Sequence, residues 1–178
     1  MSDTALHPRI REVIMALTAA QQETDALCAT ITAEQETRRL GDGWTVAQVV
    51  EHMAIVEGGA GRIVSNIAKQ VTDIPETSDA SVGDALAKYH VADPSYRKVP
   101  APEVVLPIHG ASVAESATRM REARARLIAA LEAASGTALG AAHYPHPLFG
   151  PLDGYQWSIM AAQHQRRHLV QIRTILAS

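Results

Sequence analysis

Helical periodicity in four long segments constrains the fold of this chain more than any other feature of its sequence. In each segment, apolar residues recur three and four positions apart, which is the spacing of one buried helix face. The segments cover about residues 8–32, 45–70, 113–134 and 154–177. Each has about 22–26 residues and is therefore roughly 33–39 Å long. Four helices of matched length predict an all-α protein, a four-helix bundle that forms a single domain over residues 1–178.

Local capping signals support three of these helix starts. A Ser, Thr or Asp that is followed three residues later by Gln or Glu predicts a capping box, in which two backbone N–H groups are satisfied reciprocally. The pairs are Thr45 with Gln48, Ser112 with Glu115, and Asp153 with Gln156. The boundaries at these positions are therefore the best defined in the sequence.

The second and third predicted helices are separated by a connection of about 40 residues. It contains five prolines, Pro75, Pro94, Pro100, Pro102 and Pro107. The pattern predicts at most one short helix in this connection, over residues 82–89. A connection of this length can return the chain to the end of the bundle from which it started. The predicted order is therefore up-down-down-up, with a long crossover between helices two and three, and no segment shows the alternation typical of a β-strand.

Two histidines one helical turn apart, His164 and His168, fall within the apolar stripe of the last helix. His52 has the same placement on the second helix. A buried polar group without a partner costs about 1–3 kcal/mol, so inward imidazoles need either a shared metal ion or a hydrogen-bond network. One histidine on one helix and two on another suit a three-ligand site for nickel or zinc, which accept neutral imidazole. The spacing alone leaves both interpretations open.

Four other polar residues neighbour these candidate ligands. Glu51 and Glu57 are expected to face solvent, so neither is assigned as a general base. Gln48 lies one turn before His52, and Gln171 lies three residues after His168. Each glutamine could hydrogen-bond an imidazole from behind, and helix capping or a surface contact explains each of them equally well.

The charge and cysteine content exclude several classes of protein. The net charge is −3 and the pI is near 6.2, so no nucleic-acid partner is predicted. The densest basic run is expected to form a solvated helix face and comprises Arg119, Arg121, Arg124 and Arg126. Cys28 is the only cysteine, which excludes an intrachain disulfide.

Targeting signals are not recognised in the sequence either. Residues 1–4 lack the basic and apolar regions of a secretory signal. No apolar run approaches the roughly 20 residues of a transmembrane helix. We therefore expect no membrane partner and a cytoplasmic location.

Four motifs, in this order along the chain, resemble those of the DinB-like superfamily, which includes damage-inducible DinB proteins and YfiT-like metal-dependent hydrolases. Residues 43–52, GWTVAQVVEH, resemble the W-[ST]-x-x-x-x-x-x-H opening of its second helix, and residues 101–103 resemble the APE segment of its crossover. Residues 146–152 resemble its HP-x-x-G-x-L turn, and residues 164–171 resemble its H-x-x-x-H-x-x-Q ending. The resemblance covers nearly the whole chain, and the four motifs together are much more specific than any one of them.

This resemblance implies a four-helix bundle in up-down-down-up order that is often a homodimer. It also implies a divalent metal, commonly nickel or zinc, and its ligands carried over by position are His52, His164 and His168. His146 then belongs to a structural turn. Some relatives are transferases or isomerases that use low-molecular-weight thiols such as bacillithiol or mycothiol, and many others have no assigned reaction. The family name does not imply DNA binding.

The sequence thus supports hypotheses of different classes. The first is a metal-dependent enzyme that acts on a small molecule, either a hydrolase or a low-molecular-weight-thiol transferase. The alternative is a non-catalytic metal-binding or stress-response bundle without a reaction. A third is a homodimeric bundle that acts through a partner surface, since the alanine-rich helix over residues 113–134 permits close pairing. No catalytic residue and no substrate are assigned.

Overall fold

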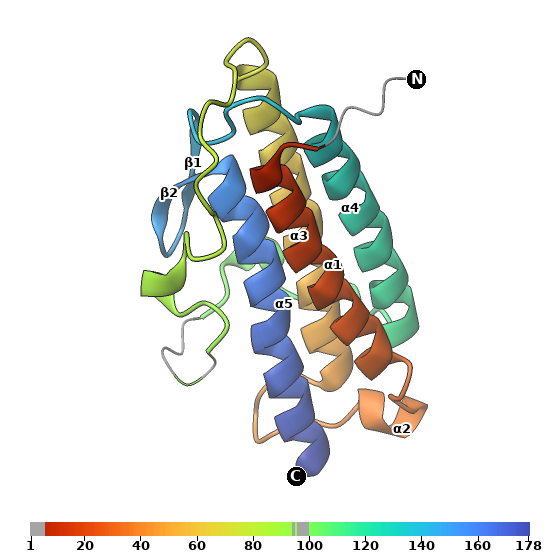
Figure 1. The fold of residues 1–178 in the computed structure, drawn as a ribbon. Coiled ribbons are helices and arrows are strands. Elements are labelled where there is room, and N and C mark those ends of the chain that lie inside the picture. Colours follow the sequence, from red (N-terminus) through yellow and green to blue (C-terminus); the bar gives the residue numbers. More distant parts are fainter. Residues whose placement is uncertain (1–5, 94, 96–99) are drawn as a thin grey trace.

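Four long helices form a four-helix bundle in this computed structural model, which describes residues 6–93, 95 and 100–178 (Figure 1). The helices are α1 (Pro8–Cys28), α2 (Ala33–Glu36), α3 (Val46–Gln70), α4 (Val113–Ala133) and α5 (Gly154–Ala177). The shorter elements are the 3₁₀ turns η1 (Ala87–Tyr89) and η2 (Glu103–Val105) and the strands β1 (His143–His146) and β2 (Gly150–Asp153). Residues 1–4, on which the expectation about a secretory signal rests, and Pro94 of the long connection lie outside the described residues.

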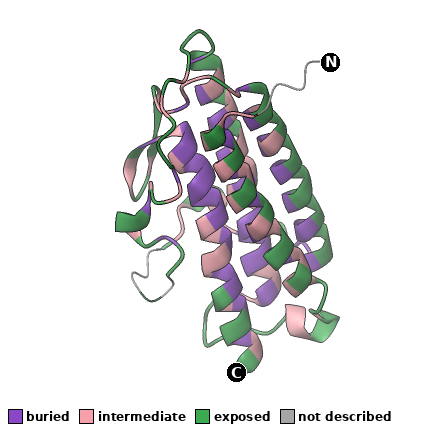
Figure 2. Cartoon of the chain, viewed as in Figure 1, coloured by how far each residue is buried: buried purple, intermediate pink, exposed green. Residues whose placement is uncertain are grey.

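Each long helix packs against two others. Both α1 and α3 contact α4 and α5, so α1 and α3 face each other across the bundle, as α4 and α5 do. Buried residues line the inner faces of all four helices, and exposed residues cover the outside (Figure 2). The core has two apolar clusters. The larger includes Ile10, Leu17, Val64, Leu131, Leu152 and Tyr155. The smaller includes Val46, Val49, Met53, Met120, Leu169 and Ile172.

The three predicted capping boxes are all present, at the N-termini of α3, α4 and α5. The end of the first helix was predicted too late, because α1 stops at Cys28 and not at Thr32. Thr32 instead caps α2, where its hydroxyl accepts from the backbone N–H of Gln35. An N-cap residue has non-helical backbone angles, so the chain has to leave the first helix before it.

A short β-hairpin precedes α5, although the sequence showed no strand alternation. Strands β1 and β2 are antiparallel, and His143 pairs with Asp153 while His146 pairs with Gly150. Each strand has only 4 residues and one of them contains Pro145, so no period-two pattern could develop. Gly150 has a φ of +74°, which glycine adopts without steric cost.

The connection between α3 and α4 also differs from its prediction. The expected helix over residues 82–89 is reduced to a series of turns that ends in η1. The segment is nevertheless anchored, since Val82 and Leu86 are buried in the core. In the part of the chain that the structure describes, no helix is long and apolar enough to cross a membrane.

Two predicted surface residues form a buried ion pair in the bundle core. Arg124 of α4 and Glu57 of α3 are 3% and 1% exposed, which corrects the expectation that both face solvent. The guanidinium binds the carboxylate twice, with Nε to Oε1 at 2.6 Å and Nη2 to Oε2 at 2.9 Å. Its third nitrogen donates to the carbonyl of Leu17 on α1. A helical wheel marks such residues as polar, but it cannot show that a facing helix supplies the opposite charge.

Candidate metal centre

The structure brings together the three histidines that the sequence singled out. His52 comes from α3, and His164 and His168 come from α5. The Nε2 atom of His164 lies 3.2 Å from that of His52 and 3.1 Å from that of His168. One ring nitrogen from each of the three residues lies within 4.8 Å of the others. His52 and His168 are buried and His164 is half-buried, so the cluster lies where α3 meets α5.

A backbone carbonyl sets the protonation of the His52 ring. Its Nδ1 lies 2.7 Å from the carbonyl oxygen of Val105, at the end of η2. Because a carbonyl only accepts hydrogen bonds, Nδ1 carries the proton and a neutral ring leaves the lone pair on Nε2. That lone pair points toward the other two histidines. This is the arrangement in which a metal-binding histidine is held by a second group behind it.

His168 is held in the same way by a side chain. Its Nδ1 lies 2.7 Å from Oε1 of Gln171, so the predicted supporting role of Gln171 agrees with the geometry. Gln48 has a different role. Its Oε1 accepts from the backbone N–H of Thr45 at 2.9 Å, which is the capping box of α3. Of the two interpretations of Gln48, helix capping is the one that the structure displays.

The donor set fits a divalent metal ion better than a closed hydrogen-bond network. With His52 and His168 protonated at Nδ1, both present Nε2 lone pairs to His164, which has one ring proton to donate. One proton cannot satisfy two acceptors fully. Metal–nitrogen bonds of 2.0–2.1 Å at tetrahedral angles place ligand nitrogens about 3.3–3.4 Å apart, close to the 3.1 and 3.2 Å observed here.

The electrostatic environment keeps these imidazoles neutral. Burial lowers the pKa of His52, although its hydrogen bond to Val105 opposes the shift. Burial and the neighbouring His52 lower the pKa of His168 to about 4. Burial is also the largest cause of the low pKa of His164, with further contributions from His168 and His52. Neutral imidazole is the form that binds a metal, so the three ligands need no deprotonation near pH 7.

Glu51 anchors the part of the α3–α4 connection that follows η2, next to the histidine cluster. Its side chain is 2% exposed, which corrects the prediction that it faces solvent. The carboxylate accepts from the backbone N–H groups of His109 at 2.7 Å and Ala111 at 3.2 Å. Glu51 therefore holds the segment that carries Val105 against α3. With both oxygens engaged in this way, Glu51 has a structural role.

An aromatic group flanks the cluster on the side of the β-hairpin. The His146 ring stacks on Phe149 with centroids 4.4 Å apart and lies 5.0 Å from Trp157. Its Nδ1 accepts from the backbone N–H of Leu148, as expected for a structural turn. Burial lowers the pKa of His146 to about 4. His146 also contributes to the low pKa of His164, which places the hairpin near the triad.

Comparison with known proteins agrees with this architecture. The family model of the DinB superfamily matches residues 16–172. The chain belongs to the DinB superfamily. Among solved structures, it is similar to "TT2238, a four-helix bundle protein", with a TM-score of 0.61 and 21% identity over 95% of this chain and 99% of that chain. This likeness shows the fold. No curated protein matches the chain.

In this DinB superfamily member, sequence reasoning missed two groups that surround His52. Val105 acts through its backbone carbonyl, which no side-chain pattern can reveal. Trp44 packs its ring against His52 with centroids 4.9 Å apart, a contact that the sequence analysis did not anticipate. The W-to-H spacing of the second-helix motif was a usable signal, because it places the tryptophan eight residues before the ligand.

Proposed function

We propose that this protein is a metal-dependent enzyme that acts on a small molecule, either as a hydrolase or as a low-molecular-weight-thiol transferase. The observation that supports it best is the convergence of three Nε2 atoms, with the tautomers of His52 and His168 fixed from behind. The proposed ligands are His52, His164 and His168, and the proposed ion is nickel or zinc.

A bound ion of this kind would supply Lewis acidity, which activates a water or a thiol near neutral pH. The residues around the three histidines orient the imidazole rings, and burial keeps these rings uncharged. Val105 and Gln171 hold two rings with their Nε2 atoms toward the centre. Trp44 packs at a tilt against the His52 ring. A thiol cofactor and a homodimer belong to the same proposal and await experiment.

We also propose that the four long helices follow the up-down-down-up order, with the connection between α3 and α4 as the crossover. The colour sequence in Figure 1 supports it, because α3 and α4 both run toward the end of the bundle near β1 while α1 and α5 run away from it. This order would explain why the connection passes the histidines, since it has to travel the length of the bundle.

The first test is elemental analysis of protein purified without a histidine tag, beside His52→Ala and His168→Ala. We expect about one nickel or zinc ion per chain, and loss of the ion in both variants while their helical circular dichroism is retained. Metal-loaded protein is then assayed with ester and amide substrates and with thiol-transfer reactions. Activity that follows metal content would support the enzyme.

Two other outcomes would contradict the proposal. If the protein takes up neither nickel nor zinc even after loading, the three histidines form a hydrogen-bond network and not a metal site. Protein that binds metal tightly without turnover in any of these assays would favour the non-catalytic bundle. Partial retention of metal in His52→Ala would show that α5 alone carries most of the affinity.

A further inference from the structure

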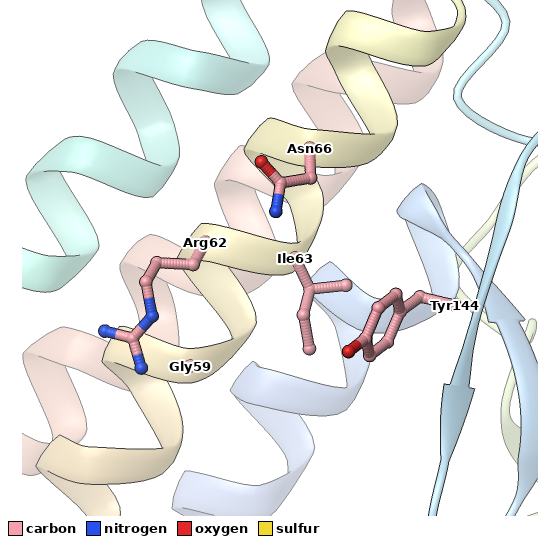
Figure 3. Close-up of a pocket in the computed structure, with 5 residues that line it drawn as sticks. All are labelled: Gly59, Arg62, Ile63, Asn66 and Tyr144. Atoms are coloured by element: carbon pink, nitrogen blue, oxygen red, sulfur yellow. The ribbon is translucent and has the colours of Figure 1, made fainter.

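A shallow hollow of about 300 Å³ lies on α3 beside the hairpin (Figure 3), and none of the three histidines lines it. It is lined by Gly59, Arg62, Ile63, Asn66 and Tyr144. In Figure 3, Arg62 and Tyr144 stand on opposite sides of Gly59 and Ile63. The hollow thus has a cationic side, an aromatic side and an apolar floor.

The floor exists because residue 59 has no side chain. A Cβ atom at Gly59 would meet no heavy atom within 4 Å, so helix packing does not require glycine there. Gly61 differs, because its Cβ would touch the Cβ of Leu127 on α4 at 3.7 Å. Glycine in a helix interior destabilises the helix relative to alanine. A mid-helix glycine that faces open space is therefore better explained by a ligand that approaches the backbone.

Three exposed side chains around this floor present polar groups to solvent, where a ligand can displace the water bound to them. Within the described residues, neither the guanidinium of Arg62 nor the amide of Asn66 has a hydrogen-bond or ionic partner. The hydroxyl of Tyr144 likewise has no hydrogen-bond partner among the described residues. Arg62 and Asn66 are four residues apart on one helix face. Arginine, amide and phenol donors around an apolar floor suit a small carboxylate with a short apolar body.

The hollow lies along the same helix pair as the metal centre. Gly59 is seven residues after His52, which is two turns and about 10.5 Å farther along α3. Trp157 is seven residues before His164 on α5, and its Nε1 donates to the carbonyl of Tyr144 at 3.1 Å. Each side of the hollow is thus tied to a helix that supplies metal ligands. Arg62 is ten residues after His52, so a molecule that joined the two sites would span about 15 Å along α3.

We propose that this hollow binds the carboxylate end of the small molecule on which the metal centre acts. The assignment of that molecule as the substrate rests on the proposed function, whereas binding of a carboxylate in the hollow does not. Arg62 pairs with the carboxylate, Asn66 and Tyr144 donate hydrogen bonds, and the apolar body lies over Gly59 and Ile63.

Benzoate is the probe, titrated into metal-free protein so that it cannot bind an ion, and followed by ¹H–¹⁵N NMR. We expect saturable shifts of the backbone amides around residues 59–66 and little response to benzyl alcohol, which has no charge. Arg62→Gln should weaken benzoate binding at least fivefold. The control is Arg173→Gln, an exposed arginine on α5 beyond the histidines, which should leave binding unchanged.

Two neighbouring glycines provide a matched pair that separates binding from folding. Gly59→Ala should weaken benzoate at least threefold because the new methyl group occupies the floor. Gly58→Ala should not, because its Cβ would only reach Nη1 of Arg62 at an ordinary 3.7 Å and Gly58 does not line the hollow. Both variants should resist urea better than the parent protein, since each replaces a mid-helix glycine by alanine. Weak binding therefore cannot be ascribed to unfolding.

The results separate this inference from the proposed function. If benzoate binding depends on Arg62 but the protein shows no turnover, the carboxylate site is supported and the proposed enzyme activity is not. Equal benzoate affinity in Arg62→Gln and the parent protein, or shifts confined to other elements, would overturn the inference whatever the metal analysis gives. Equal weakening by Gly58→Ala and Gly59→Ala would also overturn it.

Discussion

Two buried polar assemblies share α3, and they differ in how completely their atoms are paired. Glu57 lies only five residues after His52. Both carboxylate oxygens of Glu57 bind Arg124, and the remaining guanidinium nitrogen of Arg124 donates to α1. At the histidine cluster, the outer nitrogens of His52 and His168 are paired, while the inner ones face one another.

This difference favours a structural role for the ion pair and a binding role for the histidine cluster. A buried ion pair in which all three guanidinium nitrogens and both carboxylate oxygens are engaged holds α1, α3 and α4 together. At the histidine cluster, two inward lone pairs compete for the one ring proton of His164, so hydrogen bonding is incomplete. Both assemblies are polar and largely buried, although His164 is only half-buried, and the state of pairing is the clearer difference between them. The predictions below change one assembly at a time.

The largest effect is expected at the ion pair. Arg124→Met leaves the carboxylate of Glu57 buried without its partner, so the free energy of unfolding should fall by about 3–5 kcal/mol. Urea denaturation followed by circular dichroism measures it. Arg126→Met, an exposed neighbour on α4, should change stability by less than about 0.5 kcal/mol. A small effect at Arg124 would mean that water replaces the guanidinium.

The histidine cluster should make metal-free protein sensitive to acid. The pKa of His168 is lowered to about 4 in the folded chain, against about 6.5 when unfolded. The unfolded chain therefore binds the proton first, and stability that is complete above pH 6.5 is lost as the pH falls toward 4. Between pH 7 and pH 5 the loss from this residue should be about 2 kcal/mol.

Urea denaturation of metal-free protein across this pH range checks the expectation. His168→Leu should flatten the dependence, because leucine cannot take up a proton. The ion pair provides a contrast, since Arg124 keeps its charge throughout this range. The same slope in parent and His168→Leu would assign the acid sensitivity to other groups, such as His146, whose pKa burial also lowers to about 4.

Metal affinity should depend on the groups behind the histidines. Gln171→Ala removes the acceptor of the His168 Nδ1 proton, and we expect metal binding to weaken about 10–100-fold with the three ligands intact. Competition with a chromophoric chelator measures the affinity. Gln48→Ala is the matched control, because Gln48 caps α3 and should affect stability without changing affinity. Equal losses of affinity in both variants would indicate a general loosening of the helices.

The smallest effect is expected when the ion pair is replaced as a unit. The double variant Glu57→Leu, Arg124→Met should lie within about 1 kcal/mol of the parent protein in unfolding free energy, because well-packed apolar residues often substitute for a buried pair. It should also bind metal normally. A double variant as unstable as Arg124→Met alone would show that the contact of Arg124 with Leu17 dominates.

Sequence patterns that span only a few residues predicted the long helices and the three candidate metal ligands. Capping boxes placed the starts of α3, α4 and α5, and apolar spacing placed the long helices. The three candidate ligands were found because histidines within an apolar stripe need a common partner. Family motifs added the order in which these pieces occur, and the match of the DinB superfamily model confirmed the family.

Features that depend on partners far apart in sequence were not predicted. Glu57 and Arg124 are 67 residues apart, and Glu51 binds backbone groups 58 and 60 residues away. Each was assigned to the surface because its own helix gave no reason to bury it. The hairpin was missed because its strands are too short to alternate.

The turn that ends at Val105 ties the histidine cluster to an exposed segment of the crossover. Its carbonyl holds the His52 ring, yet the adjacent Val104 is 85% exposed and the turn has only 3 residues. Short exposed segments open far more often than a helix bundle unfolds. If the histidines hold an ion, each opening of this turn would release the His52 ring from its carbonyl and should speed exchange of that ion with solution.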